Sequence, residues 1–195
     1  MSESLLALDI AILPPPDVHN RAIEISASLP EHESQGLQLG RECLPHVTLT
    51  QQFVRADDLD ALLARVGENL RGHQPLTLPV TGCAHRDRTV WMTIERTRDL
   101  AALHERLMDA ILPFERSDGS AGAFLGQGAR PEDVAWVSGY RTKSSLRLFA
   151  PHITLGHATN APSIAPFSFL ATTVAACHLG HHCSCQSVLR RWELR

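Results

Sequence analysis

The stretch Leu44-Pro45-His46-Val47-Thr48-Leu49 returns later in the chain as Ala150-Pro151-His152-Ile153-Thr154-Leu155. The two tracts share Pro-His-(Val/Ile)-Thr-Leu, and their histidines lie 106 residues apart. Both tracts have a strand-like pattern, and side chains at positions i and i+2 of a strand point to the same face. Each histidine is therefore predicted to share a face with the threonine two residues later, while the aliphatic residues point into a core.

This pattern suits acid/base chemistry on a phosphate ester, because two such strands side by side place His46 and His152 around one small anion. A neutral imidazole removes a proton from the attacking water or hydroxyl, and a protonated imidazole gives a proton to the leaving oxygen. Histidine titrates near neutral pH, so both forms are accessible. We expect Thr48 and Thr154 to donate hydrogen bonds to the phosphate oxygens. The scheme needs neither a metal nor a cofactor.

Working outward from the tracts, apolar runs with a period of two predict strands, and apolar stripes with helical spacing predict helices. The predicted strands cover residues 5–13, 44–54, 76–83, 89–95 and 150–157, followed by a terminal hairpin of residues 167–179 and 183–194. The predicted helices cover residues 17–29, with Asp17 as the capping residue, 57–70 and 99–112. Residues 115–133, rich in Gly, Ser and Ala, are predicted to form a mobile loop, and residues 136–149 carry no decisive pattern.

Strands mixed with three helices indicate an α/β or α+β fold. The two tracts, each near a helix, suggest an internal duplication. A chain of 195 residues is long enough for one domain or for two closely packed lobes.

Composition limits the partners that this chain can have. The formal net charge is −3, whereas a protein that grips a long nucleic-acid duplex usually has a basic excess. We therefore expect a small phosphate ester or a single nucleotide end as the substrate. No apolar run approaches the ~20 residues of a membrane span, so no membrane partner is expected.

The chain contains five cysteines, an odd number, and its N-terminal stretch has no basic region before the apolar residues. These features predict reduced thiols and a cytoplasmic location. The sequence leaves the oligomeric state open.

The twin tracts PHVTL and PHITL resemble the signature of the two-histidine (2H) phosphoesterases. That family includes the 2′-5′ RNA ligase-like proteins and the 2′,3′-cyclic nucleotide phosphodiesterases. The resemblance covers nearly the whole chain, including LLALDIAIL, TVWMTIERTRDLAALHERL and the closing hairpin. It implies that residues 1–195 form a single α+β domain with two pseudo-symmetric lobes, in which antiparallel-rich sheets surround a central groove. It also implies that His46 is the acid and His152 the base in cyclic-phosphate hydrolysis.

The chain departs from the family pattern at one position. Several RNA ligase-like members have an arginine five residues after the second motif histidine, where it can contact phosphate, and this chain has His157 there. Arg141, Lys143 and Arg147 lie just upstream and are either substitutes for that arginine or ordinary exposed residues. Tyr140 and Phe149 are candidates to stack on a nucleobase, whereas Trp91, Trp136 and Trp192 are expected in the core.

Residues 178–185, HLGHHCSC, are dense in metal-ligand residue types. Structural zinc sites usually take two separated ligand pairs, and these residues all lie on one predicted hairpin, so alternate side chains face opposite sides. We therefore predict no metal there. The isolated histidines at positions 19, 32, 73, 85 and 104 are predicted to lie on the surface.

The sequence as a whole predicts a metal-independent phosphodiesterase that hydrolyses a 2′,3′-cyclic phosphate on a nucleotide or RNA end. His46 and His152 are the predicted catalytic residues, and the predicted substrate contacts come from Thr48, Thr154, Tyr140 and Arg141. One alternative is 2′-5′ RNA ligation or cleavage. The other is a nucleotide-binding module without turnover, which the presence of a complete acid/base pair disfavours.

Overall fold

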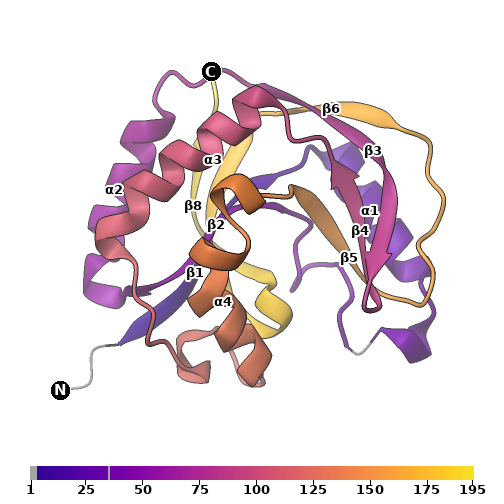
Figure 1. Cartoon of the computed structure of the whole chain (residues 1–195), viewed down its shortest axis with the longest axis horizontal. Coiled ribbons are helices and arrows are strands. Elements are labelled where there is room, and N and C mark those ends of the chain that lie inside the picture. The colour runs from indigo at the N-terminus through magenta and orange to yellow at the C-terminus, as the bar shows by residue number, and fades with distance from the viewer. Residues whose placement is uncertain (1–3, 35) are drawn as a thin grey trace.

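Two antiparallel sheets, each containing one of the paired tracts, form the centre of the fold (Figure 1). The computed structural model describes residues 4–34 and 36–195. The strands in this part of the chain are β1 (Leu5–Leu13), β2 (Val47–Arg55), β3 (Leu76–Arg86), β4 (Thr89–Ile94), β5 (His152–His157), β6 (Phe167–Ala171), β7 (Thr173–Leu179) and β8 (Cys185–Glu193). The α-helices are α1 (Pro16–Ser28), α2 (Leu59–Leu70), α3 (Arg98–Ile111) and α4 (Pro131–Lys143). The fold is therefore α+β, as predicted.

The two sheets have matching topologies. The first has the strand order β2-β1-β7-β8 and the second has the order β5-β4-β3-β6. All neighbouring strands are antiparallel, and the strand that begins at a histidine tract lies at the edge of each sheet. This correspondence confirms the pseudo-twofold duplication.

A β-bulge interrupts the pairing of β1 with β2. Thr48 pairs with Ala11, whereas Thr50 pairs with the adjacent residue Ile10. Leu49 is thus the extra residue on β2, and it points into the core with no exposed surface. A bulge changes which face the following residues occupy.

The same bulge recurs where β4 pairs with β5. Thr154 pairs with Trp91, and Gly156 pairs with the adjacent residue Val90. Gly156 has a φ of +147°, a value that L side chains rarely adopt, and a Cβ there would lie 3.1 Å from a side-chain carbon of Leu29. Each lobe therefore has a β-bulge at the equivalent place, five residues after the first residue of its tract.

One hydrophobic core joins the two lobes. The aliphatic residues of the two tracts, Val47, Leu49, Ile153 and Leu155, have no exposed surface and belong to a single cluster that includes residues of both sheets. The prediction that they point into a core is confirmed. This shared core supports our proposal that residues 1–195 fold as a single domain.

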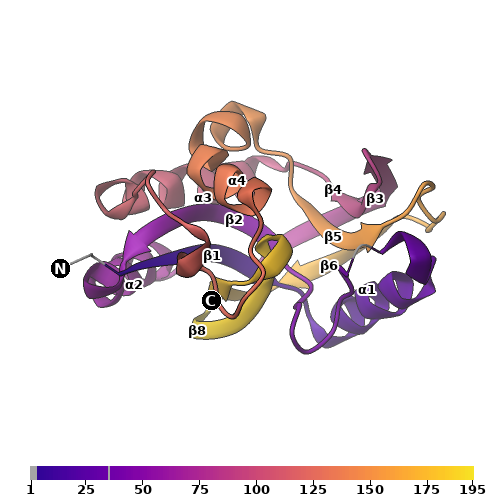
Figure 2. The same ribbon diagram turned by 90° about the horizontal axis from the view of Figure 1, so that it is seen from below.

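The helices cover the sheets from different sides (Figure 2). α1 packs against β5 of the second sheet, although it follows β1 of the first, and α3 packs against β2 although it follows β4. α4 also packs against β2, and it lies on the opposite side of the molecule from α1 in Figure 2. The helix contacts therefore link each lobe to the other.

A tight turn joins β3 to β4. Asp87 and Arg88 at its tip have φ values of 48° and 72°, and two consecutive residues in the left-handed region match the twist of a tight hairpin.

Two expectations about element boundaries were wrong. Asp17 does not cap α1, because Pro15 occupies the capping position and Asp17 lies inside the first turn. The predicted strand 167–179 is two strands separated at Thr172, with β6 paired to β3 in one sheet and β7 paired to β1 in the other. The terminal hairpin is therefore β7–β8.

The helix α4 was not predicted. Its buried residues include Val137 and Tyr140, but it lacks a continuous apolar stripe, so helical spacing gave no signal. The Asp133 side chain accepts a hydrogen bond from the backbone N–H of Arg130, which fixes the first turn. The preceding Gly-rich segment packs on the first sheet, with Phe124 buried and edge-on to Phe53.

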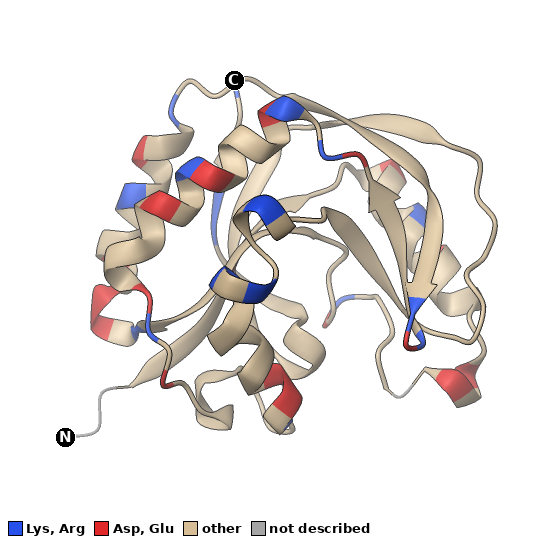
Figure 3. Cartoon of the chain, in the orientation of Figure 1, with Lys and Arg blue, Asp and Glu red and all other residues tan. Residues whose placement is uncertain are grey.

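Acidic and basic residues alternate along α2 and α3, so this surface carries no run of one charge sign (Figure 3). Among the described residues, no helix has both the length and the apolar content needed to span a membrane.

Candidate active site

His46 lies immediately before β2 and is anchored by its own backbone. Its Nδ1 lies 2.7 Å from the carbonyl oxygen of Leu44. The Leu44 N–H in turn donates to the Cys185 carbonyl oxygen at 2.9 Å, which ties the tract to β8. A carbonyl oxygen only accepts hydrogen bonds, so Nδ1 carries a proton and Nε2 is left for chemistry.

His152, the first residue of β5, is anchored in the same way. Its Nδ1 lies 2.8 Å from the carbonyl oxygen of Ala150, again two residues upstream. The neighbouring Pro151 carbonyl accepts a hydrogen bond from the Ile94 N–H at 3.1 Å. Both imidazoles are thus held in one tautomer, with Nε2 free of this anchor.

The structure brings His46 and His152 together, because β2 and β5 approach each other although they belong to different sheets. Burial lowers the pKa of His152, and the nearby His46 lowers it further. The sequence-based expectation of two imidazoles around one small anion is consistent with this placement.

The two threonines have different partners. Thr48 donates its hydroxyl proton to the Asp9 carboxylate, with 2.8 Å between Oγ1 and Oδ2. Within the described residues, Thr154 makes no hydrogen bond through its hydroxyl, and it is only half-buried. Thr154 is thus free to donate to a phosphate, whereas the hydroxyl of Thr48 holds Asp9.

Asp9 is the residue of this site that sequence reasoning missed. It lies in the middle of β1 with no exposed surface, and Oδ2 also accepts a hydrogen bond from Gln51 Nε2 at 2.8 Å. His46 Nε2 lies 3.7 Å from the same oxygen. Burial raises the pKa of Asp9, while His46, Gln51 and Thr48 act in the opposite direction.

Two tryptophans that were expected in the core lie beside the site instead. Trp136 on α4 is 48% exposed, and its Nε1–H donates to Gln51 Oε1 at 2.8 Å. Trp91 on β4 is half-buried, and its ring centroid lies 5.9 Å from that of His152. Trp91 therefore offers an aromatic surface beside His152, and Trp136 is linked to the site through Gln51.

The side chains of Tyr140 and Arg141 are not available to a substrate at this site. Tyr140 is buried in the core, and its hydroxyl lies 3.5 Å from the Leu49 carbonyl oxygen. Arg141 forms an ion pair with Glu115 and donates to the Met108 carbonyl oxygen. Their side chains are committed to packing and structure, so neither enters the mechanism below.

Phe149 and the two remaining upstream basic residues, Lys143 and Arg147, do not contribute to this site either. Phe149 is buried and stacks on the ring of His104 at 3.9 Å, so it is not available to a nucleobase. Lys143 and Arg147 are exposed, as in the alternative that treated them as ordinary surface residues.

His157 occupies the position where several RNA ligase-like members have arginine. The bulge at Gly156 returns it to the half-buried face shared by Thr154, and its Nδ1 lies 2.9 Å from the Ser34 carbonyl oxygen. The ring of His182 lies 5.5 Å away, centroid to centroid. In the first lobe, the corresponding position is Gln51, which contacts Asp9 and Trp136.

One group of metal-ligand side chains lies in the described residues. Ligand atoms of Asp9, His46 and Cys185 lie within 4.8 Å of one another. Burial raises the pKa of Cys185 well above its usual value, and contact with Cys177 raises it further. The Asp9 Oδ2 atom already accepts hydrogen bonds from Thr48 and Gln51, and we assign no metal to this group. Of residues 178–185, only Cys185 takes part in it.

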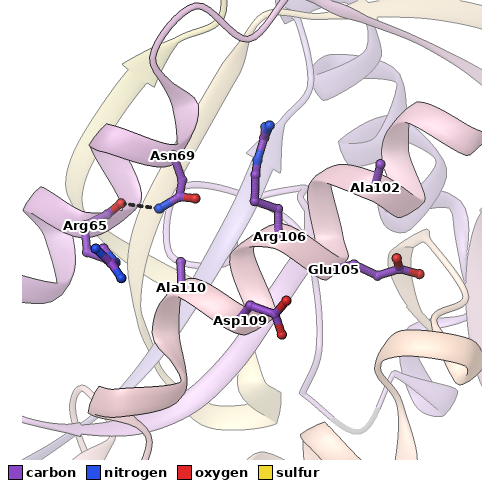
Figure 4. A pocket seen from close by; sticks show the side chains of 7 residues that line it. All are labelled: Arg65, Asn69, Ala102, Glu105, Arg106, Asp109 and Ala110. Carbon is purple, nitrogen blue, oxygen red and sulfur yellow. Dashed lines mark hydrogen bonds between the residues drawn. The ribbon is translucent and has the colours of Figure 1, made fainter.

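A surface hollow lies away from the motif histidines. It has a volume of about 600 Å³ and is formed between α2 and α3 by mainly charged and small residues (Figure 4). It contains neither motif histidine, and it offers acidic as well as basic groups, so we do not treat it as a phosphate site.

Two imidazoles anchored through Nδ1, one beside a carboxylate and one desolvated, can serve as a proton donor and a proton acceptor. The free hydroxyl of Thr154 can donate to an anion, and the two indole rings can contact an aromatic group. This set of residues is suited to acid/base chemistry on an anionic, ring-containing substrate.

The profile of the 2′-5′ RNA ligase superfamily matches residues 14–176. No curated protein matches the chain.

Among solved structures, Escherichia coli LigT complexed with NADP+ is 21% identical, with 97% of this chain and 98% of that chain covered and a TM-score of 0.62. LigT complexed with 3′-AMP is 22% identical, with 98% and 99% covered and a TM-score of 0.61. TT0787 of Thermus thermophilus is 20% identical, with 97% and 98% covered and a TM-score of 0.62. These similarities show a shared fold over nearly the whole length.

Proposed function

Because this chain belongs to the 2′-5′ RNA ligase superfamily of two-histidine phosphoesterases, we propose that it is a phosphodiesterase acting on a 2′,3′-cyclic phosphate at a nucleotide or RNA end. The observation that carries the proposal is the matched anchoring of His46 and His152. Both donate Nδ1–H to the carbonyl two residues upstream, which leaves two Nε2 atoms for one reaction.

In the proposed reaction, His152 Nε2 removes a proton from water while the water oxygen forms a bond to phosphorus. The bond between phosphorus and one ribose oxygen breaks, and His46 Nε2 gives its proton to that oxygen. The product is a phosphomonoester with a free hydroxyl. The lowered pKa of His152 favours the neutral base at neutral pH, and His46 Nε2 lies 3.7 Å from the Asp9 carboxyl group.

Nucleotide recognition is proposed to involve the tryptophans that flank the histidines. A nucleobase can stack on an exposed indole, and Trp136 presents almost half of its surface. Structures of LigT with 3′-AMP and with NADP+ show that a protein of this fold can be complexed with nucleotides. All five cysteines are free, which supports our proposal of a reducing, cytoplasmic setting.

The main alternative is 2′-5′ ligation or 2′-5′ cleavage, which uses similar catalytic groups. A binding module without turnover is the second alternative. Binding alone does not require two histidines that share a tautomer, one beside a carboxyl group and the other with a lowered pKa.

Turnover of a cyclic phosphate is expected to survive EDTA, because the proposed steps use only side chains of this chain. The test is a panel of 2′,3′-cyclic nucleotides, oligonucleotides with 2′,3′-cyclic phosphate ends and 2′-5′-linked dinucleotides, each incubated with and without EDTA. Hydrolysis of the cyclic phosphates in both conditions supports the proposal. Loss of turnover in EDTA with recovery in zinc contradicts it, and turnover of the 2′-5′ linkage alone favours the main alternative.

The two threonines are expected to respond differently to replacement by the isosteric valine. Thr154→Val removes a free donor, and one hydrogen bond to a charged oxygen contributes about 1.5–3 kcal/mol, so kcat/KM is expected to fall roughly 10- to 150-fold. Thr48→Val instead removes a donor to Asp9 and is expected to change the pH dependence of turnover. Thr50→Val is the matched control, because the Thr50 hydroxyl is buried without a partner. An equal, pH-independent loss in both site variants would contradict this division of roles.

A further inference from the structure

Asp9 is a carboxyl group buried in an apolar strand without an arginine or lysine partner among the described residues. Its Oδ2 accepts hydrogen bonds from Thr48 and Gln51, and its Oδ1 has no hydrogen-bond partner. A buried carboxylate with incomplete hydrogen bonding is costly unless a positive charge or a proton compensates it. The basic group placed against it is the imidazole of His46, at 3.7 Å.

The second lobe lacks this carboxyl group. Directly after the bulge in the first lobe, Asp9 pairs with Gln51. At the same step in the second lobe, Thr89 pairs with His157. The two motif histidines therefore have the same backbone anchor, but among the described residues only His46 has an acidic neighbour. This difference breaks the symmetry between two otherwise equivalent histidines.

The geometry favours one proton on this pair. The Nδ1–H of His46 is committed to the Leu44 carbonyl oxygen, so a neutral His46 has its unprotonated Nε2 atom 3.7 Å from Asp9 Oδ2. A lone pair facing an ionised carboxylate is repulsive. Repulsion becomes attraction when one proton is present between Nε2 and Oδ2, whichever of the two atoms it is bound to.

We propose that Asp9 is a positioning residue that, together with His46, holds one proton at the site and thereby makes His46 the proton donor of the reaction. The assignment of a reaction rests on the proposed function, whereas the shared proton is a property of the free protein. During turnover the proton leaves Nε2 for the ribose oxygen, and solvent restores it afterwards.

The other titratable groups around Asp9 and His46 do not change their protonation state through the neutral pH range. Burial raises the pKa of Tyr140 on α4, of Cys183 before β8 and of Cys185 on β8, and Asp9 raises all three further. Burial also raises the pKa of Cys43 to about 11. These groups are neutral between pH 5 and 9. His152 is the remaining titrating neighbour.

The test compares pH profiles of kcat/KM for the wild type and Asp9→Asn, which preserves side-chain size and an oxygen acceptor. The alkaline limb, which reports loss of the donor's proton, is expected to move to lower pH by about one to three units in Asp9→Asn. The acid limb, which reports the base, should move much less. Asp133→Asn, at another buried carboxylate that pairs with Arg130, is the matched control and should leave both limbs in place. A uniform loss of activity without a shifted limb would overturn the proposal.

A second measurement needs no substrate. NMR titration of the wild-type protein should show the Asp9 carboxyl carbon and the His46 ring responding at the same pH, with a single proton lost from the pair. The His46 midpoint should move to lower pH in Asp9→Asn, while the His152 midpoint should move little. Independent titration of Asp9 and His46 in the wild type would overturn the proposal even if the variant does not fold. If the coupled titration is seen but no cyclic phosphate is turned over, the proposed function fails and the proton pair stands.

Discussion

His46→Ala and His152→Ala are each expected to lower kcat by about 10²–10⁴-fold, the usual contribution of one general acid or base. The two imidazoles are held by equivalent hydrogen bonds, and each substitution removes one end of the proton path. Their combined effect should be smaller than the product of the single effects, because both histidines act in one transition state. Steady-state kinetics on a 2′,3′-cyclic nucleotide measures kcat for the two single variants and for the double variant.

The fold is expected to tolerate these substitutions, since both side chains are only partly buried. His85→Ala, in the exposed segment at the end of β3, is the matched control and should leave kcat unchanged. Binding of a non-hydrolysable nucleotide should be measured in parallel, because it separates lost chemistry from lost affinity. Normal kcat in both folded histidine variants would reject two-histidine catalysis and favour the binding module.

The features that depend on local pattern could be predicted from the sequence. Alternation along each tract placed Val47 and Ile153 in the core because strand periodicity depends on a few adjacent residues. The recurrence of a five-residue motif predicted the duplication without any knowledge of the sheet order. The expectation that His46 and His152 share one site followed from these two local observations.

Asp9 could not be assigned to the site because its role depends on strand register. The pairing of Asp9 with Gln51, 42 residues away, brings the Asp9 carboxyl group close to His46. A signal was present, since an aspartate inside LLALDIAIL lies on a strand that is otherwise buried. A buried carboxyl group requires partners, but the sequence does not identify them.

The prediction that His104 lies on the surface was wrong, and the reason is tertiary contact. His104 has no exposed surface. Its Nδ1 lies 2.6 Å from the Leu49 carbonyl oxygen, and its Nε2 accepts a hydrogen bond from the Leu146 N–H. The burial of a polar ring between α3, β2 and the segment before the second tract satisfies both nitrogens, which a helical pattern alone does not reveal.

Ile153→Asp is expected to unfold the protein or to prevent its folding. Ile153 has no exposed surface and belongs to the core that joins the two lobes. The effective penalty for burying an unpaired ion is several kcal/mol, comparable with the whole stability of a typical domain, about 5–15 kcal/mol. Val47→Asp is expected to have the same effect from the other lobe, because Val47 is buried in the same cluster.

The decisive comparison is with Thr154→Asp, which places the same carboxylate one residue further along β5 on the half-buried face. Urea denaturation followed by circular dichroism should show Thr154→Asp folded, whereas Ile153→Asp has no cooperative transition or one at a much lower urea concentration. Ile153→Val, which removes one methylene from the core, should cost only about 0.5–1.5 kcal/mol, so that the loss in Ile153→Asp is due to charge. Equal stability of Ile153→Asp and Thr154→Asp would mean that the two faces of β5 are wrongly assigned. The imidazole of His152 and the hydroxyl of Thr154 would then not share the face on which the proposed chemistry depends.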